Sequence, residues 1–434
     1  MTNSETKNFS QNVSSSYHLE DRGKCNKNIC ANTCNVPKLR FKGYNYNYDK
    51  IPLKNISTRI KRVNSDSIAP VMMISANCGF IMQSEKYSRD NAGKSLTKYT
   101  IIHKGELAYN HGASKAKPYG CCFQIDVDEA RIPYVYHCFK IDKNNYAPYI
   151  ALYLNNKLLE RELRKLVSSS VRMDGLLNIS YEDYTNIKLN LPRYEEQKKI
   201  ASFLTLIDKK IEKQKELVEL LKKYKKGLLS AIFSQKLRFK DDNGNDYPAW
   251  EEKRLGDICK IVGGGTPDTN NVKYWGDDIN WFTPTEIIKK YADSSNRKIS
   301  RLGLLKSSAK ILPIGTVLLT TRATLGEMSI LSIEATTNQG FQSLIPVKDE
   351  VSSEFIYYCQ PIIKYFCYKY ANGSTFLEIS KQTLAKLKLM IPNKDEQNKI
   401  SDFLSKFDDK IQQEECILSN LQTYKKGLLQ QMFI

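Results

Sequence analysis

The strongest pattern in the chain is an apolar stripe that occurs twice, 200 residues apart. Residues 191–234 and 391–434 align without a gap and are identical at 18 of 44 positions. In each copy a proline precedes an acidic first turn, and apolar residues then recur at alternating steps of four and three, which predicts a long helix with a coiled-coil seam. The predicted helix-pairing positions are Ile200, Leu204, Ile207, Ile211 and Leu221 in the first copy and Ile400, Leu404, Phe407, Ile411 and Leu421 in the second.

Each predicted helix carries one polar residue in its seam, Gln214 in the first and Glu414 in the second. Such residues commonly fix the register of a coiled coil. Because each helix alone would expose its stripe, we expect the two to pair within the chain as an antiparallel coiled coil. About 33 residues at 1.5 Å each give a rod of roughly 50 Å, about one and a half turns of duplex DNA. The rod is a candidate ruler, and a dimerisation coiled coil without a measuring role is the alternative.

The duplication extends over almost the whole chain. The sequence Lys-Leu-Arg-Phe-Lys opens both halves, at residues 38–42 and 236–240. The predicted domains are a polar, disordered tail at 1–36, a first body at 37–190, a first helix at 191–234, a second body at 235–390 and a second helix at 391–434. The chain is therefore predicted to be a tandem duplication.

The two bodies resemble each other little, although they occupy equivalent places. Each mixes short apolar runs with Gly, Asn, Ser and Thr turns. In residues 311–331, β-branched runs are interrupted by Gly315 and Gly326, which predicts neighbouring strands joined by a turn. Late in each body an amphipathic helix is predicted, at 146–166 and 354–370, followed by a polar loop. The predicted fold class is α/β (α+β), with a mixed, β-rich body before each long helix.

Length and charge narrow the class of protein. A chain of 434 residues is too long for one core and has 66 Lys and Arg against 47 Asp and Glu, a net charge of +19. This surplus favours a polyanionic partner, above all nucleic acid. No apolar run approaches the roughly 18 residues that span a bilayer, and no secretory h-region opens the sequence, so we expect no membrane association and a cytoplasmic location with its 11 cysteines reduced.

Motifs of catalysis are missing. The fragment Gly93-Lys94-Ser95 lacks the first glycine of a phosphate-binding loop, since position 88 is Ser88. Residues 263–265 are three glycines without dinucleotide-loop spacing, and we interpret them as a tight turn or a close approach to DNA. No Asn-Pro-Pro-Tyr or Asp-Pro-Pro-Tyr tetrapeptide, expected of an adenine methyltransferase, occurs. These observations favour a chain that is not an enzyme and holds no cofactor.

Cysteines offer only a weak metal signal. Cys25, Cys30 and Cys34 follow His18, but their spacing lacks the paired C-x-x-C of a zinc site, so we predict no metal. Cys121 and Cys122 precede an apolar run and are predicted to be small buried side chains.

Taken together, the motifs resemble the specificity subunit of type I restriction-modification systems. The resemblance rests on two bodies with two helices, on Pro-x-x-x-Glu-Gln-x-x-Ile at the start of each helix, and on Lys-Leu-Arg-Phe at the start of each half. The segments at 250–267 and 315–326 add to it. The first body departs from the pattern, because residues 48–56 lack the Trp and Gly-Asp of the second copy.

This resemblance implies that the chain recognises a DNA target and catalyses no reaction itself. Each body would be a target recognition domain that reads one half of a bipartite site in double-stranded DNA, and the helices would set the spacer. Type I methyltransferase subunits, two of them, would dock on the chain and bring S-adenosylmethionine to methylate adenine. Type I restriction endonuclease subunits would bring ATP and Mg for cleavage. The chain itself would need no cofactor.

Loop residues of the types that read base edges are the candidate DNA contacts. They are His111, Ser114, Lys115, Lys117, Ser170 and Arg172 in the first body, and Thr321, Arg322, Thr324, Asn338, Gln339, Gln342, Asn372, Ser374 and Lys381 in the second. Two other interpretations remain open. A coiled-coil adaptor would bind proteins without reading DNA sequence, and a self-sufficient restriction or methylation enzyme would transfer methyl groups alone.

Overall fold

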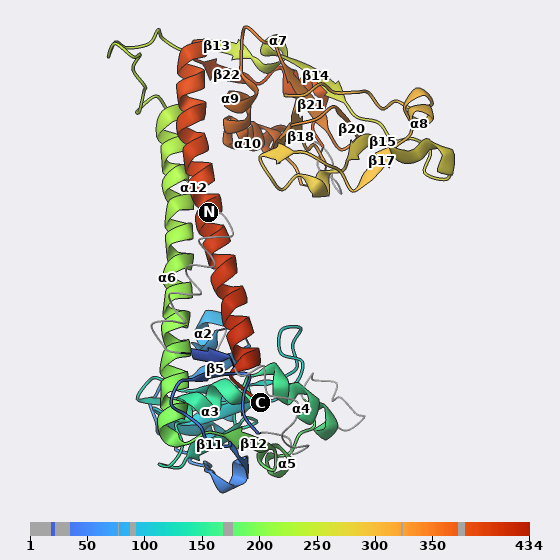
Figure 1. Ribbon diagram of the computed structural model, residues 1–434. Coiled ribbons are helices and arrows are strands. Elements are labelled where there is room, and N and C mark those ends of the chain that lie inside the picture. Colours follow the sequence, from blue (N-terminus) through green and yellow to red (C-terminus); the bar gives the residue numbers. More distant parts are fainter. Residues whose placement is uncertain are drawn as a thin grey trace. The chain divides into compact units, whose positions relative to one another are not determined.

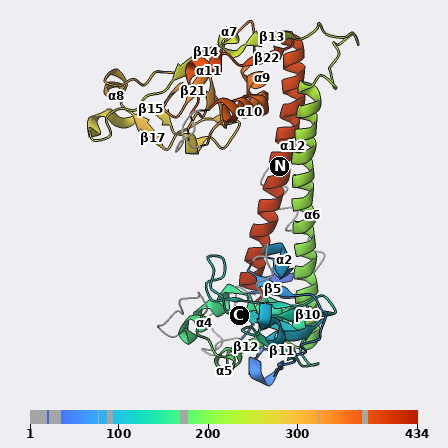
Figure 2. The same cartoon turned by 180° about the vertical axis from the view of Figure 1, so that it is seen from behind.

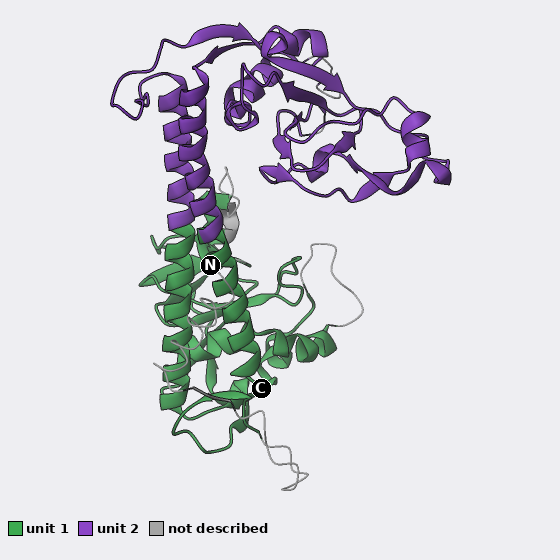
Figure 3. Cartoon of the chain, turned by 45° about the horizontal axis from the view of Figure 1, so that its top comes forward, with its two compact units in different colours: residues 1–216, 414–434 green, residues 217–413 purple. Residues whose placement is uncertain are grey.

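The computed structural model consists of two compact units (Figures 1 and 3). The structure describes residues 19–21, 35–76, 78–86, 93–167, 177–322, 324–371 and 378–434. Unit 1 comprises residues 1–216 and 414–434, and unit 2 comprises residues 217–413. Each unit therefore combines one body with the early part of one long helix and the late part of the other.

Unit 1 is built on a four-stranded sheet in the order β4-β11-β8-β9, with β7-β10, β5-β6, β3-β12 and β1-β2 as further strand pairs. Its strands are β1 (Leu19–Asp21), β2 (Leu39–Phe41), β3 (Asp49–Pro52), β4 (Ser57–Arg59), β5 (Met72–Ser75), β6 (Gly79–Met82), β7 (Thr100–His103), β8 (Leu107–Asn110), β9 (Cys121–Gln124), β10 (Glu129–Ile132), β11 (His137–Ile141) and β12 (Lys188–Leu191). Its helices are η1 (Leu53–Asn55), α2 (Gln83–Lys86), η2 (Gly93–Lys98), α3 (Ala147–Leu154), η3 (Lys157–Leu159), α4 (Glu160–Leu166) and α5 (Tyr181–Thr185).

Unit 2 contains a five-stranded sheet, β14-β21-β18-β19-β16, a three-stranded sheet, β17-β15-β20, and the pair β13-β22. Its strands are β13 (Glu251–Arg254), β14 (Cys259–Gly263), β15 (Trp275–Phe282), β16 (Tyr291–Ala292), β17 (Arg297–Ile299), β18 (Val317–Leu319), β19 (Met328–Leu331), β20 (Ala335–Thr337), β21 (Gln342–Pro346) and β22 (Lys388–Ile391). Its helices are α7 (Leu255–Ile258), η4 (Val272–Tyr274), η5 (Pro284–Glu286), α8 (Arg301–Leu305), α9 (Ser353–Tyr358), α10 (Gln360–Tyr370) and α11 (Lys381–Ala385). The predicted mixed, β-rich fold class is confirmed.

Two long helices, α6 (Tyr194–Phe233) of 40 residues and α12 (Lys394–Gln431) of 38, run side by side in opposite directions (Figures 1 and 2). In unit 1, Ile200 and Leu204 of α6 share a core with Leu428 of α12, and in unit 2, Ile400 and Leu404 of α12 share one with Ile232 of α6. The other predicted seam residues are buried or half-buried. The predicted antiparallel helix pair is confirmed.

Polar contacts between the helices repeat with the duplication. The side-chain amide of Gln214 donates to Glu414 Oε2 at 2.6 Å. In unit 1 Lys425 pairs with Asp208, and in unit 2 Lys225 pairs with Asp408. Because both the lysines and the aspartates are 200 residues apart, the two ion pairs are copies of one contact. They stabilise the same register as the Gln214–Glu414 bond, as predicted for a polar seam position.

An ion pair, buried in unit 1 and partly exposed in unit 2, joins the two repeated motifs of each half. In unit 1, Arg40 donates from Nε to Glu196 Oε1 and from Nη2 to Oε2, both at 2.7 Å, and neither side chain is exposed. In unit 2, Arg238 donates to both oxygens of Glu396, at 3.2 and 2.6 Å. Bidentate pairing of this kind is the preferred geometry of arginine with a carboxylate. The ion pair therefore fastens the start of each half to its long helix.

In unit 1, Tyr48 bonds the buried glutamate as Trp250 does in unit 2. The indole Nε1 of Trp250 donates to Glu396 at 3.0 Å, and the hydroxyl of Tyr48 donates to Glu196 at 3.2 Å. Burial and the negative charge of Glu196 raise the pKa of Tyr48, so its hydroxyl stays a donor. The first body thus keeps the contact although it lacks the Trp of the second.

The glutamine that follows this glutamate is equally repeated. Gln197 Oε1 accepts from the backbone N of Tyr146 at 2.8 Å, and Gln397 Oε1 accepts from that of Ser352 at 2.9 Å. Each amide nitrogen also donates to the carbonyl of the preceding proline, Pro192 or Pro392. The glutamine therefore ties the long helix to the N-terminus of α3 in unit 1 and of α9 in unit 2.

The amphipathic helix predicted at 146–166 is interrupted, and the one predicted at 354–370 is divided into α9 and α10. Asn155 ends α3 because its side chain bonds both backbone groups of Cys122 on β9. Asn156 then adopts an extended backbone, and its side chain accepts from Leu158 N to cap η3. Local side-chain bonds of asparagine compete with the helix in this way. The prediction of one continuous helix was wrong for this reason.

Candidate DNA interface

The same hairpin presents a polar loop in each unit. In unit 1, Gly105 precedes β8 and Gly120 precedes β9, with φ of 90° and 78°. In unit 2, Gly315 and Gly326 stand in the corresponding places of the β18–β19 hairpin, both with φ of 83°. Glycine adopts this left-handed backbone without a steric penalty. The frame is shared, whereas the loops at 111–119 and 320–325 differ in length and in side chains.

Three loops of unit 2 meet at the β18–β19 hairpin. The backbone N of Thr321 donates to the carbonyl of Gly340 at 2.7 Å, and the Thr324 hydroxyl donates to that of Pro284 at 3.3 Å. The Thr266 hydroxyl donates to Gln339 Oε1 at 2.5 Å. The structure therefore brings the loop of Gln339 to the hairpin that carries Thr324, and it adds Thr266, which the sequence reasoning missed.

Arg322 is an exposed cation on the loop between β18 and β19. Its Nη2 lies 2.8 Å from Glu378 Oε2, with the two side chains 49% and 39% exposed. A surface pair of this kind contributes little to stability. It holds the guanidinium in one place on the loop. Glu378 was also missed, because its role depends on a contact across 56 positions of sequence.

The other candidates of unit 2 are placed differently. Thr321 is fully buried, which removes it from the residues that can touch a base directly. Asn338 Oδ1 accepts from Gly340 N at 2.8 Å and shapes its own loop. Gln342 lies on β21 opposite Gly263 and is half-buried. No hydrogen bond or ion pair in the part of the chain that the structure describes joins Lys381, the exposed first residue of α11, to the cluster. Asn372 and Ser374 lie outside the described residues.

In unit 1 the corresponding loop is folded back on its own unit. Ser114 and Lys117 close a turn through two bonds of 3.1 Å, and Lys117 Nζ donates to the carbonyl of Asn155 at 2.9 Å. Burial lowers the pKa of Lys117. Lys115 is exposed at the tip, whereas the His111 ring packs 5.1 Å from that of His137. Lys115 and Ser114 are therefore the accessible candidates. Ser170 and Arg172 lie outside the described residues.

The three glycines at 263–265 approach protein backbone. A Cβ on Gly264 would lie 1.9 Å from the carbonyl oxygen of Asn338, and one on Gly265 would lie 2.4 Å from the backbone N of Ala309. Neither has a positive φ. The backbone of residues 264–268 forms no turn, so the predicted tight turn is wrong. The segment packs against the backbone of unit 2, which holds the loop of Gln339 in position, and a close approach to DNA stays a prediction.

His137 gives unit 1 a pH dependence. Its Nε2 lies 2.9 Å from the carbonyl of Ile179, yet burial lowers the pKa of the ring below its usual 6.5. His137 therefore takes up a proton more readily in the unfolded chain than in the folded one. The stability that the neutral ring contributes to unit 1 is fully present above about pH 6.5 and is lost as the pH falls below that value. We expect His137→Gln to flatten the decline of the thermal midpoint between pH 7 and pH 5. His103→Gln, at the half-exposed end of β7, is the control, and equal slopes in all three chains would contradict the assignment.

Among the described residues, no group of three or more His, Cys, Asp or Glu side chains could hold a metal ion. Cys121 and Cys122 are buried on β9, as predicted. Cys25, Cys30 and Cys34, for which no metal was predicted, lie outside the described residues.

Within the described ranges, no helix combines the length and the apolar character required to cross a membrane.

Comparison with known proteins gives one consistent result. The chain is 37% identical over 191 residues to the MjaIX specificity subunit of Methanocaldococcus jannaschii, an alignment covering 43% of this chain and 44% of that protein. It is 23% identical to the putative MjaX specificity subunit of the same organism, over 79% of this chain and 80% of that one. The chain thus spans less than half of the first relative and four fifths of the second.

Solved structures share the fold. The S subunit of a type I restriction-modification system from M. genitalium superposes with a TM-score of 0.54 at 15% identity, over 92% of this chain and 99% of that one. A chain from a study of complex assembly and conformational transition of the type I system gives a TM-score of 0.56 at 16% identity, over 89% and 98%. The sequence profile of the type I restriction modification DNA specificity domain matches residues 123–222 and 248–423, more than half of the chain. The chain therefore belongs to the family of type I restriction-modification DNA specificity subunits.

Proposed function

We propose that this chain selects a bipartite site in double-stranded DNA, with each unit reading one half. As a member of its family it is a non-catalytic DNA specificity subunit. The observation that carries the proposal is the repeated hairpin, which keeps one frame in both units and presents different polar side chains. A protein that recognises an asymmetric DNA target needs two binding surfaces that share a backbone frame but differ in their side chains.

Arg322 and Gln339 are the best candidate base readers of unit 2. Arginine can bind guanine, and glutamine adenine, through two hydrogen bonds on the major-groove edge. Both residues lie on exposed loops, and their neighbours Thr266 and Glu378 hold them in place. In unit 1, Lys115 and Ser114 are the corresponding candidate base readers. The surplus of positive charge across the chain supports contacts to phosphate, which position the protein without selecting sequence.

Two type I methyltransferase subunits are the proposed protein partners, and they would supply S-adenosylmethionine. Restriction endonuclease subunits would add ATP- and Mg-dependent cleavage. Docking on the helices is supported by α6, where Leu217, Leu220 and Tyr224 are 39%, 62% and 57% exposed at steps of three and four. A second apolar stripe of this kind suits a partner helix. The length of α6 and α12 would set the unread spacer of the DNA.

Loss of Arg322 tests the readers. We expect Arg322→Ala to weaken binding of the target by about 1–3 kcal/mol and to relax base preference at one position of one half-site, because a bidentate contact is lost. Fluorescence anisotropy with duplexes changed one base pair at a time measures both effects. Arg254→Ala, on exposed strand β13, removes the same charge away from the loops. Equal affinity and base preference in the Arg322→Ala and unaltered chains would remove Arg322 from the interface.

The proposal as a whole is tested by single-molecule methylome sequencing. A host without its own systems expresses the cognate methyltransferase with or without this chain. Methyladenine at one bipartite motif only when the chain is present supports the proposal and gives the target. Co-purification without any methylated motif would favour the adaptor interpretation. Methyl transfer by the isolated chain would favour the self-sufficient enzyme.

A further inference from the structure

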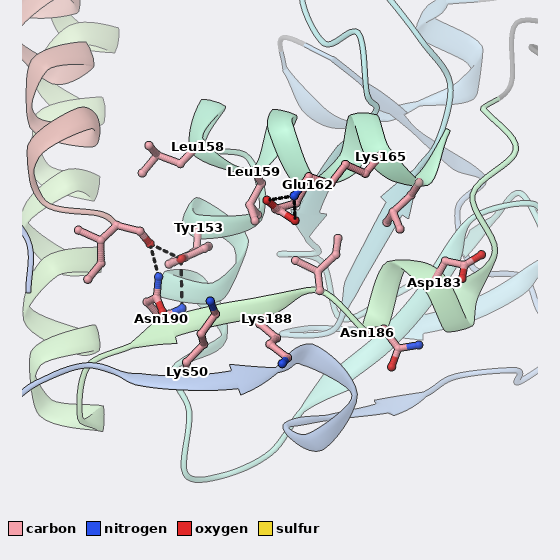
Figure 4. Close-up of a pocket in the computed structure, with 13 residues that line it drawn as sticks. Lys50, Tyr153, Leu158, Leu159, Glu162, Lys165, Asp183, Asn186, Lys188 and Asn190 are labelled. Carbon is pink, nitrogen blue, oxygen red and sulfur yellow. Dashed lines mark hydrogen bonds and ion pairs between the residues drawn. The ribbon is translucent and has the colours of Figure 1, made fainter. Parts of the chain in front are cut away.

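A pocket of about 550 Å³ opens on unit 1 between the β3–β12 strand pair and the helices α4 and α5 (Figure 4). Its lining combines apolar side chains with charged side chains of both signs. Leu158, Leu159, Leu166 and Ile187 are the apolar members, Lys50, Lys165 and Lys188 are the cations, and Glu162 and Asp183 are the anions. The pocket plays no part in the DNA interface described above, since none of the candidate base readers lines it.

The strand register places two of these lysines on one face. Asn190 lies opposite Lys50 and Lys188 lies opposite Pro52, so Lys50 and Lys188 are diagonal neighbours on the same side of the pair. Side chains in such positions are within reach of each other, and like charges there are unfavourable. Among the described residues, neither ammonium group has a hydrogen-bond or ion-pair partner. Lys165 differs, because it binds both oxygens of Glu162 at 2.7 and 2.9 Å.

Unit 2 shows what the same strand pair holds in the other copy. There β13 pairs with β22, Glu252 lies opposite Met390, and Arg254 lies opposite Lys388. Lys388 and Glu252 occupy the positions of Lys188 and Lys50, and they form an ion pair of 2.7 Å. Where one half of the duplication places a lysine beside a glutamate, the other places two lysines beside an open pocket. The two acidic residues of the pocket bind other groups, Glu162 the ammonium of Lys165 and Asp183 the hydroxyl of Ser180. Among the described residues no carboxylate bonds Lys50 or Lys188 directly, which points to an anion from outside the chain.

We infer that this pocket receives an acidic side chain from a partner protein, one carried on a segment that also has apolar residues. A carboxylate between Lys50 and Lys188 replaces the charge that Glu252 supplies in unit 2, and the leucines of α4 and η3 receive the apolar part. This lining distinguishes a protein partner from DNA, because a phosphate backbone gains nothing from leucine. The inference rests on the proposed function, in which methyltransferase subunits bind this chain.

The substitution Lys50→Glu tests the inference without endangering the fold. It introduces a carboxylate where unit 2 has one, so we expect the thermal midpoint to stay or rise. Affinity for the cognate methyltransferase subunit, measured by surface plasmon resonance, should fall at least about tenfold because a desolvated charge contact becomes repulsive. Lys54→Glu changes the net charge equally on the neighbouring η1, outside the pocket, and should leave the affinity within about twofold.

The possible outcomes separate the explanations. Equal methyltransferase affinity of the Lys50→Glu and unaltered chains overturns the inference. A fall in DNA affinity beyond that of Lys54→Glu, with methyltransferase binding intact, also overturns it and assigns the pocket to phosphate. Failure of the unaltered chain to bind the methyltransferase contradicts the proposed function and the inference with it. Carbodiimide coupling in the assembled complex should join Lys50 or Lys188 to an Asp or Glu of the methyltransferase, and coupling of neither lysine would count against the pocket.

Discussion

Replacing Glu196 with alanine is expected to lower the free energy of unfolding of unit 1 by about 3–5 kcal/mol. The substitution leaves the guanidinium of Arg40 buried without its partner, and an uncompensated buried charge is among the most costly single changes in a protein. The hydroxyl of Tyr48 loses its acceptor at the same time. Amide hydrogen exchange, resolved for peptides of residues 35–76 and 194–216, measures this loss of stability where it occurs.

Glu195→Ala is the matched control, because Glu195 is the exposed neighbour in the same first turn of α6. The combined change of Arg40→Met and Glu196→Leu should recover most of the stability, since apolar residues of similar size remove the unpaired charge. Glu396→Ala in unit 2 should cost less than Glu196→Ala, because Arg238 is 26% exposed and water can solvate it. A Glu196→Ala chain as stable as Glu195→Ala would show that the ion pair is not needed.

Gly264→Ala is expected to destabilise unit 2 by about 3 kcal/mol, the upper end of the cost of overpacking. The added Cβ would lie 1.9 Å from the carbonyl oxygen of Asn338 and 2.5 Å from that of Thr337, so backbone must move. Gln339 follows these residues, and its loop should shift with them. We therefore expect weaker discrimination at one half of the DNA site together with the lower stability.

Tryptophan fluorescence measures the first effect selectively, because all three tryptophans, Trp250, Trp275 and Trp281, belong to unit 2. Gly263→Ala is the control, since its nearest neighbour would lie 3.7 Å from the new Cβ. If Gly264→Ala unfolds at the same urea concentration as Gly263→Ala, the segment is less tightly packed than described.

The periodic parts of the fold could be predicted from the sequence. The stripes of α6 and α12, the polar seam pair Gln214 and Glu414, and the turn at Gly326 all depend on spacings of a few residues. Such local patterns remain visible in a single chain because burial of one helix face imposes them. The long-range contacts were not predictable in this way: Arg40 meets Glu196 across 156 positions, and Arg322 meets Glu378 across 56.

The candidate DNA contacts were predicted only by residue type. Thr321 and Thr324 have the same side chain three positions apart, yet the first is buried and the second exposed. A polar loop alone does not reveal which side chains turn inward to bond the protein's own backbone, as Lys117 does to Asn155. The interrupted helix at Asn155 and Asn156 has the same cause, because amide side chains satisfied neighbouring backbone groups in place of the helix.

The division of the units gives the chain an unusual order of maturation. Unit 2 is one continuous stretch, residues 217–413, whereas unit 1 also requires residues 414–434. Leu428, Met432 and Phe433 belong to the core of unit 1, and the Phe433 ring stacks 5.2 Å from that of Tyr149. On the ribosome, domains fold as units once their residues have emerged. Unit 1 begins first in the sequence but is completed last, because its core lacks residues 414–434 until after all the residues of unit 2 have been synthesised.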